Sequence, residues 1–369
     1  MAVRHEGVAI DPAVSVGGSG PTTGPRVAFS WYGIPHYAAR AINAAIERLG
    51  RECPVIGSPP TVPLEGVEAA LGHPIRWVDG DSPTSWAALD LEPPDIFFQS
   101  GWSYPAFNAL GREVKARGGK VVGICDTNWR GDFRQLVLGP VAFRLLHRRR
   151  FDAVIVPGAQ STRMMRYFGM PASRIHHGMD GADPTLFGGG APLATRPKQF
   201  LFVGQFIARK DVIGLAEAFI RFAADRPDWT LSMIGGGEQE ALIPRHPRIT
   251  VEPFVQPHAL AERFRQARFF VLGSHVEAWG LVVHEAALSG CGLLLSHAIG
   301  SGDDLATPDN AIRFRAGDRD DLVRALHEAA DWDEARLARA EAASRAIATR
   351  FGPARFAEAV CAEVGSCRP

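Results

Sequence analysis

The stretch that decides the fold is FFVL-GSHVEAWG-LVVHEAALSG-CGLLLS, residues 269–296. Its first four residues, Phe269 to Leu272, form a short apolar run that is typical of a buried parallel strand. A loop follows, then a helical pattern that begins near Gly280, and a second apolar run that ends at Ser296. The order strand, loop, helix, strand predicts a βαβ unit of a parallel sheet.

Two carboxylates, Glu277 and Glu285, lie eight residues apart across the junction of this loop and this helix. Open parallel sheets bind ligands at the carboxyl ends of their strands, which is where Glu277 falls. The free amides of a helix that begins near Gly280 suit a phosphate, whereas a carboxylate suits sugar hydroxyls. Glu285 has apolar helix neighbours, and a carboxylate there is costly unless it is paired or belongs to a site. Together these residues predict a nucleotide-sugar pocket.

The composition narrows the class of protein. A chain of 369 residues is long enough for two domains, and its formal net charge of zero argues against nucleic acid as the main partner. The five cysteines are scattered and form no CxxC pair, so reduced cysteines and a cytoplasmic location are expected. No apolar run approaches the ~20 residues that a membrane span needs. Residues 1–25 lack the apolar core of a signal peptide.

Strand and helix patterns alternate from Arg26 onward, which predicts an α/β fold of two tandem doubly wound, Rossmann-like domains with a cleft between them. We expect a flexible lead-in over 1–25, a first domain over 26–190 and a second domain over 198–350. The glycine-rich break at 188–192 places a linker at about 184–197. We expect the last segment, 351–369, to be a helix that packs back on the first domain.

A second motif follows the first strand of the second domain. Gly204 allows a close turn there, and Arg209 and Lys210 lie just before a predicted helix. Two cations and free amides at that position are suited to a diphosphate. Basic residues in loops are more often simply solvated, so the motif gains weight only with Glu277 and Glu285 on the same face.

With both motifs in place, the C-terminal half resembles a retaining GT-B-fold glycosyltransferase of the family 4, or glycosyl transferases group 1, type. The match extends over about 198–365 strongly and over 26–190 weakly. It depends on the order of the Arg209–Lys210 turn, the E-x7-E pair and a later Asn310 with Asp318. An isolated E-x7-E pair would be a weak signal.

The resemblance implies a role for each matching residue. Arg209 and Lys210 would neutralise the diphosphate of the donor as it leaves, and Glu277 would bind the transferred sugar. Glu285 would hold the ribose, and the backbone of Gly280, Leu281 and Val282 would meet the phosphates beside Gly204. The donor would be a nucleotide-diphosphate sugar, UDP- or GDP-linked, with no metal and no other cofactor. The acceptor would be a glycan or a lipid-linked molecule.

The first domain departs from the family pattern. A glycine pair often follows the first strand in the family, and here only Gly33 corresponds to it. Asp126 is placed for an acceptor-side role, although an aspartate that caps a helix is an equal alternative. The pair His176–His177 has no third ligand nearby, and a loop position without a role is the favoured interpretation.

The first domain also carries a basic run. Ten Lys or Arg residues stand against three Asp or Glu residues between Arg112 and Arg150. A basic amphipathic helix there would contact anionic lipid at the inner face of the membrane, and a solvated helix face is the open alternative.

Three functions remain in competition. The leading hypothesis is a retaining hexosyltransferase that builds cell-surface polysaccharide or glycolipid. A sugar-nucleotide epimerase would share the fold, but it needs acid–base carboxylates in the first domain, where the sequence reveals no convincing cluster. A non-catalytic sugar-nucleotide-binding protein is the third.

Overall fold

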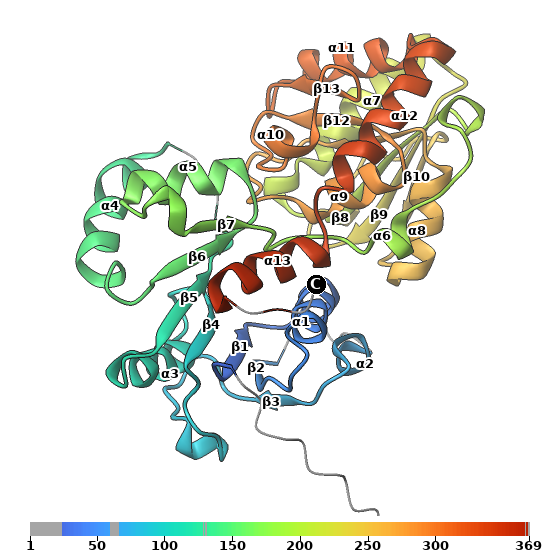
Figure 1. The fold of residues 1–369 in the computed structure, drawn as a ribbon. Coiled ribbons are helices and arrows are strands. Elements are labelled where there is room, and N and C mark those ends of the chain that lie inside the picture. The colour runs from blue at the N-terminus through green and yellow to red at the C-terminus, as the bar shows by residue number, and fades with distance from the viewer. Residues whose placement is uncertain (1–23, 60–65, 128, 130, 366, 368–369) are drawn as a thin grey trace, which may run out of the picture.

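The computed structural model describes residues 24–59, 66–127, 129, 131–365 and 367. The expected lead-in therefore lies outside the described residues, apart from its last two positions. Two separate α/β lobes face each other, the first drawn from blue to green and the second from yellow to red (Figure 1). None of the described helices is both long enough and apolar enough to cross a membrane.

The first lobe is built on a sheet of seven parallel strands in the order β3-β2-β1-β4-β5-β6-β7. The strands are β1 (Val27–Trp31), β2 (Val55–Gly57), β3 (Ile75–Trp77), β4 (Ile96–Ser100), β5 (Lys120–Ile124), β6 (Ala153–Val156) and β7 (Ile175–His177). The helices are α1 (His36–Leu49), α2 (Val67–Leu71), α3 (Pro105–Ala116), α4 (Gly139–Ala142) and α5 (Ala159–Phe168), with the π-helical turns η2 (Arg134–Leu138) and η3 (Phe143–His147) on either side of α4.

The second lobe has six parallel strands in the order β10-β9-β8-β11-β12-β13. The strands are β8 (Gln199–Gln205), β9 (Thr230–Gly236), β10 (Ile249–Glu252), β11 (Phe269–Leu272), β12 (Gly292–Ser296) and β13 (Ala311–Phe314). The helices are α6 (Pro184–Phe187), α7 (Val212–Asp225), α8 (Pro257–Gln266), α9 (Leu281–Leu288), α10 (Gly302–Leu305), α11 (Arg319–Ala330) and α12 (Glu334–Ala348), with a 3-10 turn, η6 (Ala208–Lys210), before α7.

Both sheets have apolar residues on their two faces, as expected for strands buried between helices. In the opening stretch, β11 pairs with β12 in the register Phe269 to Gly292, and all four β11 residues are buried. The bounds of β11 are those that its apolar run predicts. The predicted fold class, two doubly wound Rossmann-like domains, is confirmed.

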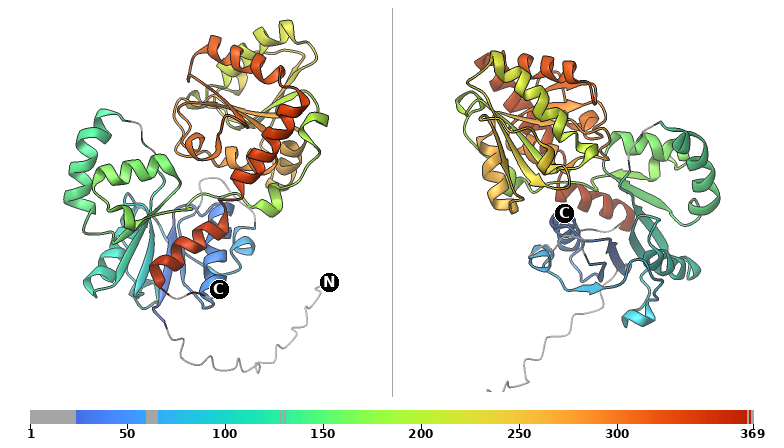
Figure 2. Two further views of the ribbon diagram at one scale, coloured as in Figure 1. Left: turned by 45° about the horizontal axis from the view of Figure 1, so that its top comes forward. Right: turned by 180° about the vertical axis from the view of Figure 1, so that it is seen from behind.

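The last helix, α13 (Pro353–Val364), leaves the second lobe and lies against α1 of the first (Figures 1 and 2). Phe356 is fully buried, and its ring centre lies 6.4 Å from that of Phe29 in β1 and 6.1 Å from that of Trp31. At the other end of the helix, Glu363 pairs with Lys120. The core of the first lobe is therefore completed by α13.

Two expectations from the sequence are wrong in this region. His176 and His177 lie in β7 and both have partners: His176 Nε2 is 2.5 Å from Glu363 Oε1, and His177 Nε2 is 2.7 Å from Thr162 Oγ1. Cys361 and Cys367 form a disulfide, so not all cysteines are reduced. Gly365 ends α13 in a left-handed conformation, which turns the chain back so that the two Cα atoms lie 5.7 Å apart.

The segment expected as a linker, 184–197, is packed on the second lobe. It contains α6, and the buried Arg196 side chain donates hydrogen bonds to the backbone oxygens of Ala267 and Ser289 at 3.0 and 2.7 Å. The first of the two crossings between the lobes is therefore made by the short stretch between β7 and α6, and the second precedes α13.

Candidate functional site

The two predicted motifs of the second lobe meet in one ion-pair cluster. Lys210 Nζ contacts Glu277 Oε2, and both side chains are buried. Arg209 Nη1 lies 3.7 Å from the other oxygen, Glu277 Oε1, and Ser274 Oγ lies 3.4 Å from Oε2. The two loops are also joined by their backbones, because His275 N–H donates to Arg209 O at 2.8 Å. Two cations thus surround one carboxylate at the carboxyl ends of β8 and β11.

Backbone geometry holds the cationic turn in place. Gly204 and Gly235 are paired at the ends of β8 and β9, and a Cβ on Gly235 would overlap the carbonyl oxygen of Gly204. Asp211 starts α7 with a positive φ of 55°, and its carboxylate accepts from Arg319 Nη1 at 2.8 Å. That ion pair stabilises a strained conformation directly after Lys210.

The start of α9 is the predicted phosphate site. Gly280 precedes it with a φ of 85°, and a Cβ there would lie 3.0 Å from Glu277 Cγ. Within the described residues, the amides of Leu281 and Val282 make no hydrogen bond, as is usual in a first helical turn. These amides remain available to an anion, as the helix dipole favours.

Glu285 lies one turn further along α9 and is half-buried. Desolvation raises the pKa of its carboxyl to about 8. This carboxyl makes no hydrogen bond and no ion pair with the described residues. A poorly solvated carboxyl without a partner is suited to bind a ligand hydroxyl.

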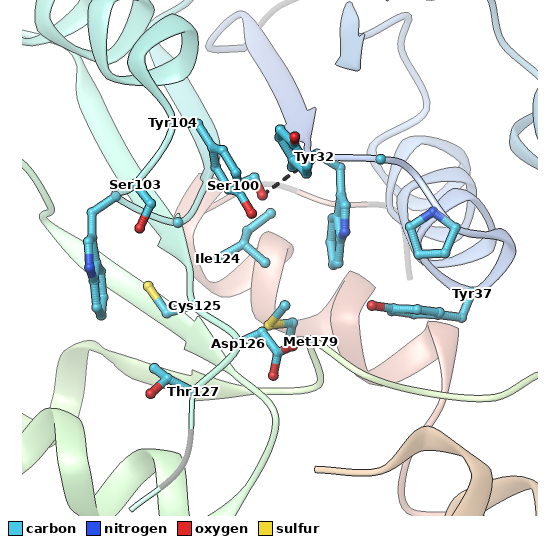
Figure 3. Close-up of a pocket in the computed structure, with 15 residues that line it drawn as sticks. Tyr32, Tyr37, Ser100, Ser103, Tyr104, Ile124, Cys125, Asp126, Thr127 and Met179 are labelled. Carbon is cyan, nitrogen blue, oxygen red and sulfur yellow. Dashed lines mark hydrogen bonds between the residues drawn. The ribbon is translucent and has the colours of Figure 1, made fainter. Parts of the chain in front are cut away.

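Across the cleft from this cluster, the first lobe contains a cavity of about 590 Å³ at the carboxyl ends of β1, β4 and β5 (Figure 3). Gly33, in the turn after β1, lines it, and Asp126 follows β5 at its floor. The remaining lining residues are largely aromatic or hydroxylated: Trp31, Tyr32, Tyr37, Ser100, Trp102, Ser103, Tyr104 and Thr127. Tyr32 and Tyr104 stack with ring centres 4.0 Å apart. Aromatic faces with polar edges are suited to sugar rings.

Asp126 faces the second lobe and does not cap a helix. Burial raises the pKa of Asp126, the charge of Glu277 raises it further, and Arg209 lowers it. The acceptor-side and donor-side candidates are therefore within electrostatic reach of one another across the cleft.

A second buried carboxyl, Asp180, was not recognised from the sequence. It is 5% exposed, and its Oδ1 has no hydrogen-bond partner among the described residues. Burial and the charge of Asp126 raise its pKa well above the usual range, and a hydrogen bond from Tyr37 lowers it in part. In Figure 3 the Tyr37 hydroxyl points toward Asp126 and Met179. The first domain therefore contains a pair of interacting buried carboxyls, Asp126 and Asp180, which the sequence alone does not reveal.

The lobes touch at the start of α5. Ala159 N–H donates to Asp304 Oδ1 at 3.1 Å, and Trp279 Nε1 donates to Asp304 Oδ2 at 3.1 Å. A Cβ on Gly158 would overlap the Asp304 carboxylate. Asp304 thus joins a helix start of the first lobe to the loop that carries Glu277.

Residues 190–346 match the family model described as "Glycosyl transferases group 1". This match covers the second lobe and leaves the first lobe unmatched. The matched residues contain the Lys210–Glu277 cluster and α9, so the group 1 domain holds the complete donor-side candidate site. Glycogen synthase of Mycobacterium tuberculosis is 29% identical over 164 residues, which are 42% of this chain and 40% of that protein. The aligned region thus spans less than half of the curated relative.

Solved structures extend the likeness to both domains. Anabaena Alr3699/HepE in complex with UDP and glucose has a TM-score of 0.70 at 15% identity and covers 93% of this chain and 100% of its own. Sucrose-phosphate synthase from Thermosynechococcus elongatus has a TM-score of 0.63 at 17% identity, with 90% and 96% covered. At such identities the likeness shows the fold, which is GT-B, with the group 1 domain as its second half.

Proposed function

We propose that this protein is a retaining hexosyltransferase. It takes a sugar from a nucleotide-diphosphate sugar bound on the group 1 domain and transfers it to a hydroxyl of an acceptor bound in the first-domain cavity. The observation that carries the proposal is the Lys210–Glu277–Arg209 cluster, which lies across the cleft from Asp126. The donor site of Alr3699/HepE, which binds UDP and glucose, supports a UDP-linked donor, and GDP is the alternative.

Each residue then has a chemical task. The bond between the anomeric carbon and the diphosphate oxygen breaks, and its electron pair leaves with the nucleoside diphosphate. Arg209 and Lys210 stabilise that negative charge, with the amides of Leu281 and Val282. Glu277, held by Lys210, accepts from hydroxyls of the sugar, and Glu285 accepts from the ribose.

The acceptor oxygen forms the new bond and loses its proton. Asp126 is the group we assign to receive it, because a carboxyl with a raised pKa is a better base near neutral pH than an ordinary one. The aromatic cavity would orient a glycan acceptor or the sugar head of a lipid-linked one. Transfer to such acceptors belongs to cell-surface polysaccharide or glycolipid synthesis.

The test is a thermal-shift panel of UDP, GDP, ADP and dTDP with their sugars, followed by product analysis of the anomeric linkage by NMR. A ligand that binds only the folded state raises the melting temperature. We expect one family of nucleotides to raise the melting temperature clearly. We also expect the new linkage in the product to have the same anomeric configuration as the sugar in the donor. The absence of any shift would overturn the donor site. Binding without transfer or hydrolysis would leave a sugar-nucleotide-binding protein.

The Asp126–Asp180 cluster favours a second candidate, a sugar-nucleotide epimerase, since epimerisation needs acid–base groups in this position. Removal and return of a ring proton would exchange it with solvent. Incubation of nucleotide sugars in deuterium oxide decides between the two, because deuterium in the sugar ring would support the epimerase and its absence beside a transfer product would exclude it.

A further inference from the structure

One flank of the first domain concentrates positive charge. Between Phe133 and Met179 the chain contains eight arginines, no lysine and a single acidic residue, Asp152, a net charge of +7. Because the whole chain is neutral, the remainder carries −7. Asp152 forms an ion pair with Lys115, whose Nζ lies 2.8 Å from Asp152 Oδ1. Positive charge is therefore concentrated in residues 133–179 and negative charge in the rest of the chain, although the net charge of the whole chain is zero.

The same flank exposes apolar side chains. Thirteen large hydrophobic residues are exposed in the described part of the chain, and seven of them fall within the fourteen residues from Phe133 to Leu146. Their exposed fractions run from 40% for Leu136 to 75% for Leu145. The seven are Phe133, Leu136, Val137, Leu138, Val141, Leu145 and Leu146. Exposed apolar side chains at this density indicate an interaction surface.

We call this flank, residues 133–179, the arginine–apolar face; η2, α4, η3 and α5 form its outer part and pack on one another at the outer end of the first domain (Figure 1). Its inner side is fixed by Phe143, whose ring lies 5.8 Å from that of Phe168. On its outer side, Leu136 shares a hollow of about 590 Å³ with Arg163 and Arg166. Cationic and apolar groups therefore occur together on one surface.

The arginines of this face have no carboxylate partner in the described part of the chain. None of the eight forms an ion pair with a described residue. Arg144 donates only to the backbone oxygens of Phe168 and Tyr167, at 3.3 and 3.4 Å. Elsewhere on the surface, arginines such as Arg319 and Arg324 each pair with two carboxylates.

We propose that the arginine–apolar face docks the protein on an anionic lipid bilayer. Exposed leucine, valine and phenylalanine side chains can enter the boundary between headgroups and acyl chains, while arginines meet the lipid phosphates. Nucleic acid would bind the arginines but leave the apolar side chains exposed, and an apolar protein partner would cover the leucines but leave the arginines unpaired. A bilayer with anionic headgroups satisfies both.

The position of the face relates it to the acceptor cavity. Trp102 lines that cavity, and its ring lies 5.6 Å from that of His147 and 5.9 Å from that of Phe143, both in η3. Docking would therefore place the cavity beside the headgroups. The docking inference does not depend on the proposed activity, because vesicle binding is measured without a donor or an acceptor.

The test is co-sedimentation of the full chain with phosphatidylcholine vesicles that contain or lack phosphatidylglycerol. We expect binding to the anionic vesicles only, and loss of this binding at high salt. The double variant Leu145→Ser, Leu146→Ser should reduce partitioning by about 10-fold or more, because two apolar side chains no longer insert. Arg148→Gln with Arg149→Gln should do the same through charge.

The matched control is Leu242→Ser with Phe254→Ser, two equally exposed apolar residues of the second domain. It should bind like the unmodified protein, and all variants should keep the unmodified melting temperature and nucleotide-induced shift. Failure to bind anionic vesicles overturns the proposal, as does binding that the control reduces as much as the Leu145–Leu146 variant does. A dimer that the Leu145–Leu146 variant disperses, without vesicle binding, would instead assign the face to a second copy of this chain.

Discussion

Gly181 and Gly352 lie in direct backbone contact, so close that a Cβ on Gly181 would overlap the Cα of Gly352. They belong to the two chain segments that cross between the domains, one before α6 and one before α13. His284 of α9 ties both crossings together: its Nδ1 accepts from Ala182 N–H at 2.9 Å, and its Nε2 donates to Ala348 O at 2.8 Å. The helix that carries Glu285 is thus hydrogen-bonded to the chain at both crossings.

Gly181→Ala should destabilise the protein by about 1–3 kcal/mol, since the added methyl group must push two backbones apart. The measurement is the free energy of unfolding from denaturant titration. Gly236→Ala is the control, because its nearest neighbour, Glu240 Oε2, would be 3.7 Å from the new Cβ. Equal stabilities of the two variants would show that the crossings do not pack as described.

Lys210→Ala should weaken the binding of the nucleoside diphosphate by about 10-fold to 100-fold, the value of a charge-assisted hydrogen bond. Isothermal titration calorimetry measures this. Lys198→Ala, which removes an exposed lysine paired with Asp228, should leave the affinity unchanged. An unchanged affinity for Lys210→Ala would remove this lysine from the site.

Glu277→Ala should abolish transfer and leave nucleotide affinity largely intact.

Glu285→Gln should flatten the pH dependence of stability. The folded carboxyl keeps its proton up to about pH 8, whereas the unfolded one releases it near its ordinary pKa of 4.5. Between these values the folded state binds more protons, so the free energy of unfolding falls as the pH rises. Melting temperatures across this range should decline less in Glu285→Gln than in the unmodified protein or in the exposed control Glu238→Gln. Parallel curves for all three would contradict the burial of Glu285.

Asp126→Asn should reduce transfer by about 100-fold or more and leave donor binding unchanged, because the acceptor proton loses its base. The unmodified enzyme should lose activity as the pH falls through the raised pKa of Asp126, and the variant should lack this acid limb. Rates across pH, with Asp309→Asn as an exposed control, check both points. A variant with full activity would place the base elsewhere.

Much of the fold could be predicted because buried parallel strands are continuous apolar runs, as in β11. β7 was missed because it is a short edge strand that contains two histidines and so lacks an apolar run. Glu363, the partner of His176, lies 187 residues further along the chain. Asp180 was missed with it, because its place near the cleft follows from the end of β7. The sequence placed Lys210 and Glu277 on one edge of the sheet, but their contact depends on how two loops fold over β8 and β11.

The arginine–apolar face was predicted only in part. A basic amphipathic helix was expected in the run from Arg112 to Arg150, and the structure divides residues 134–147 of this run into π-helical turns around α4. Which side chains are exposed depends on Phe143 and Gln135, which point inward. Periodicity based on an ideal α-helix cannot supply that assignment.

The return of α13 to the first domain also bears on how the protein is made. Phe29 of β1 leaves the ribosome long before Phe356, yet the two rings belong to one core. Most of the second domain can fold as it emerges, while the first must wait, with an uncovered apolar surface beside β1, until α13 is synthesised. We expect a chain that is cut short before Pro353 to be retained by chaperones or to aggregate, even though it would contain every residue of the candidate site.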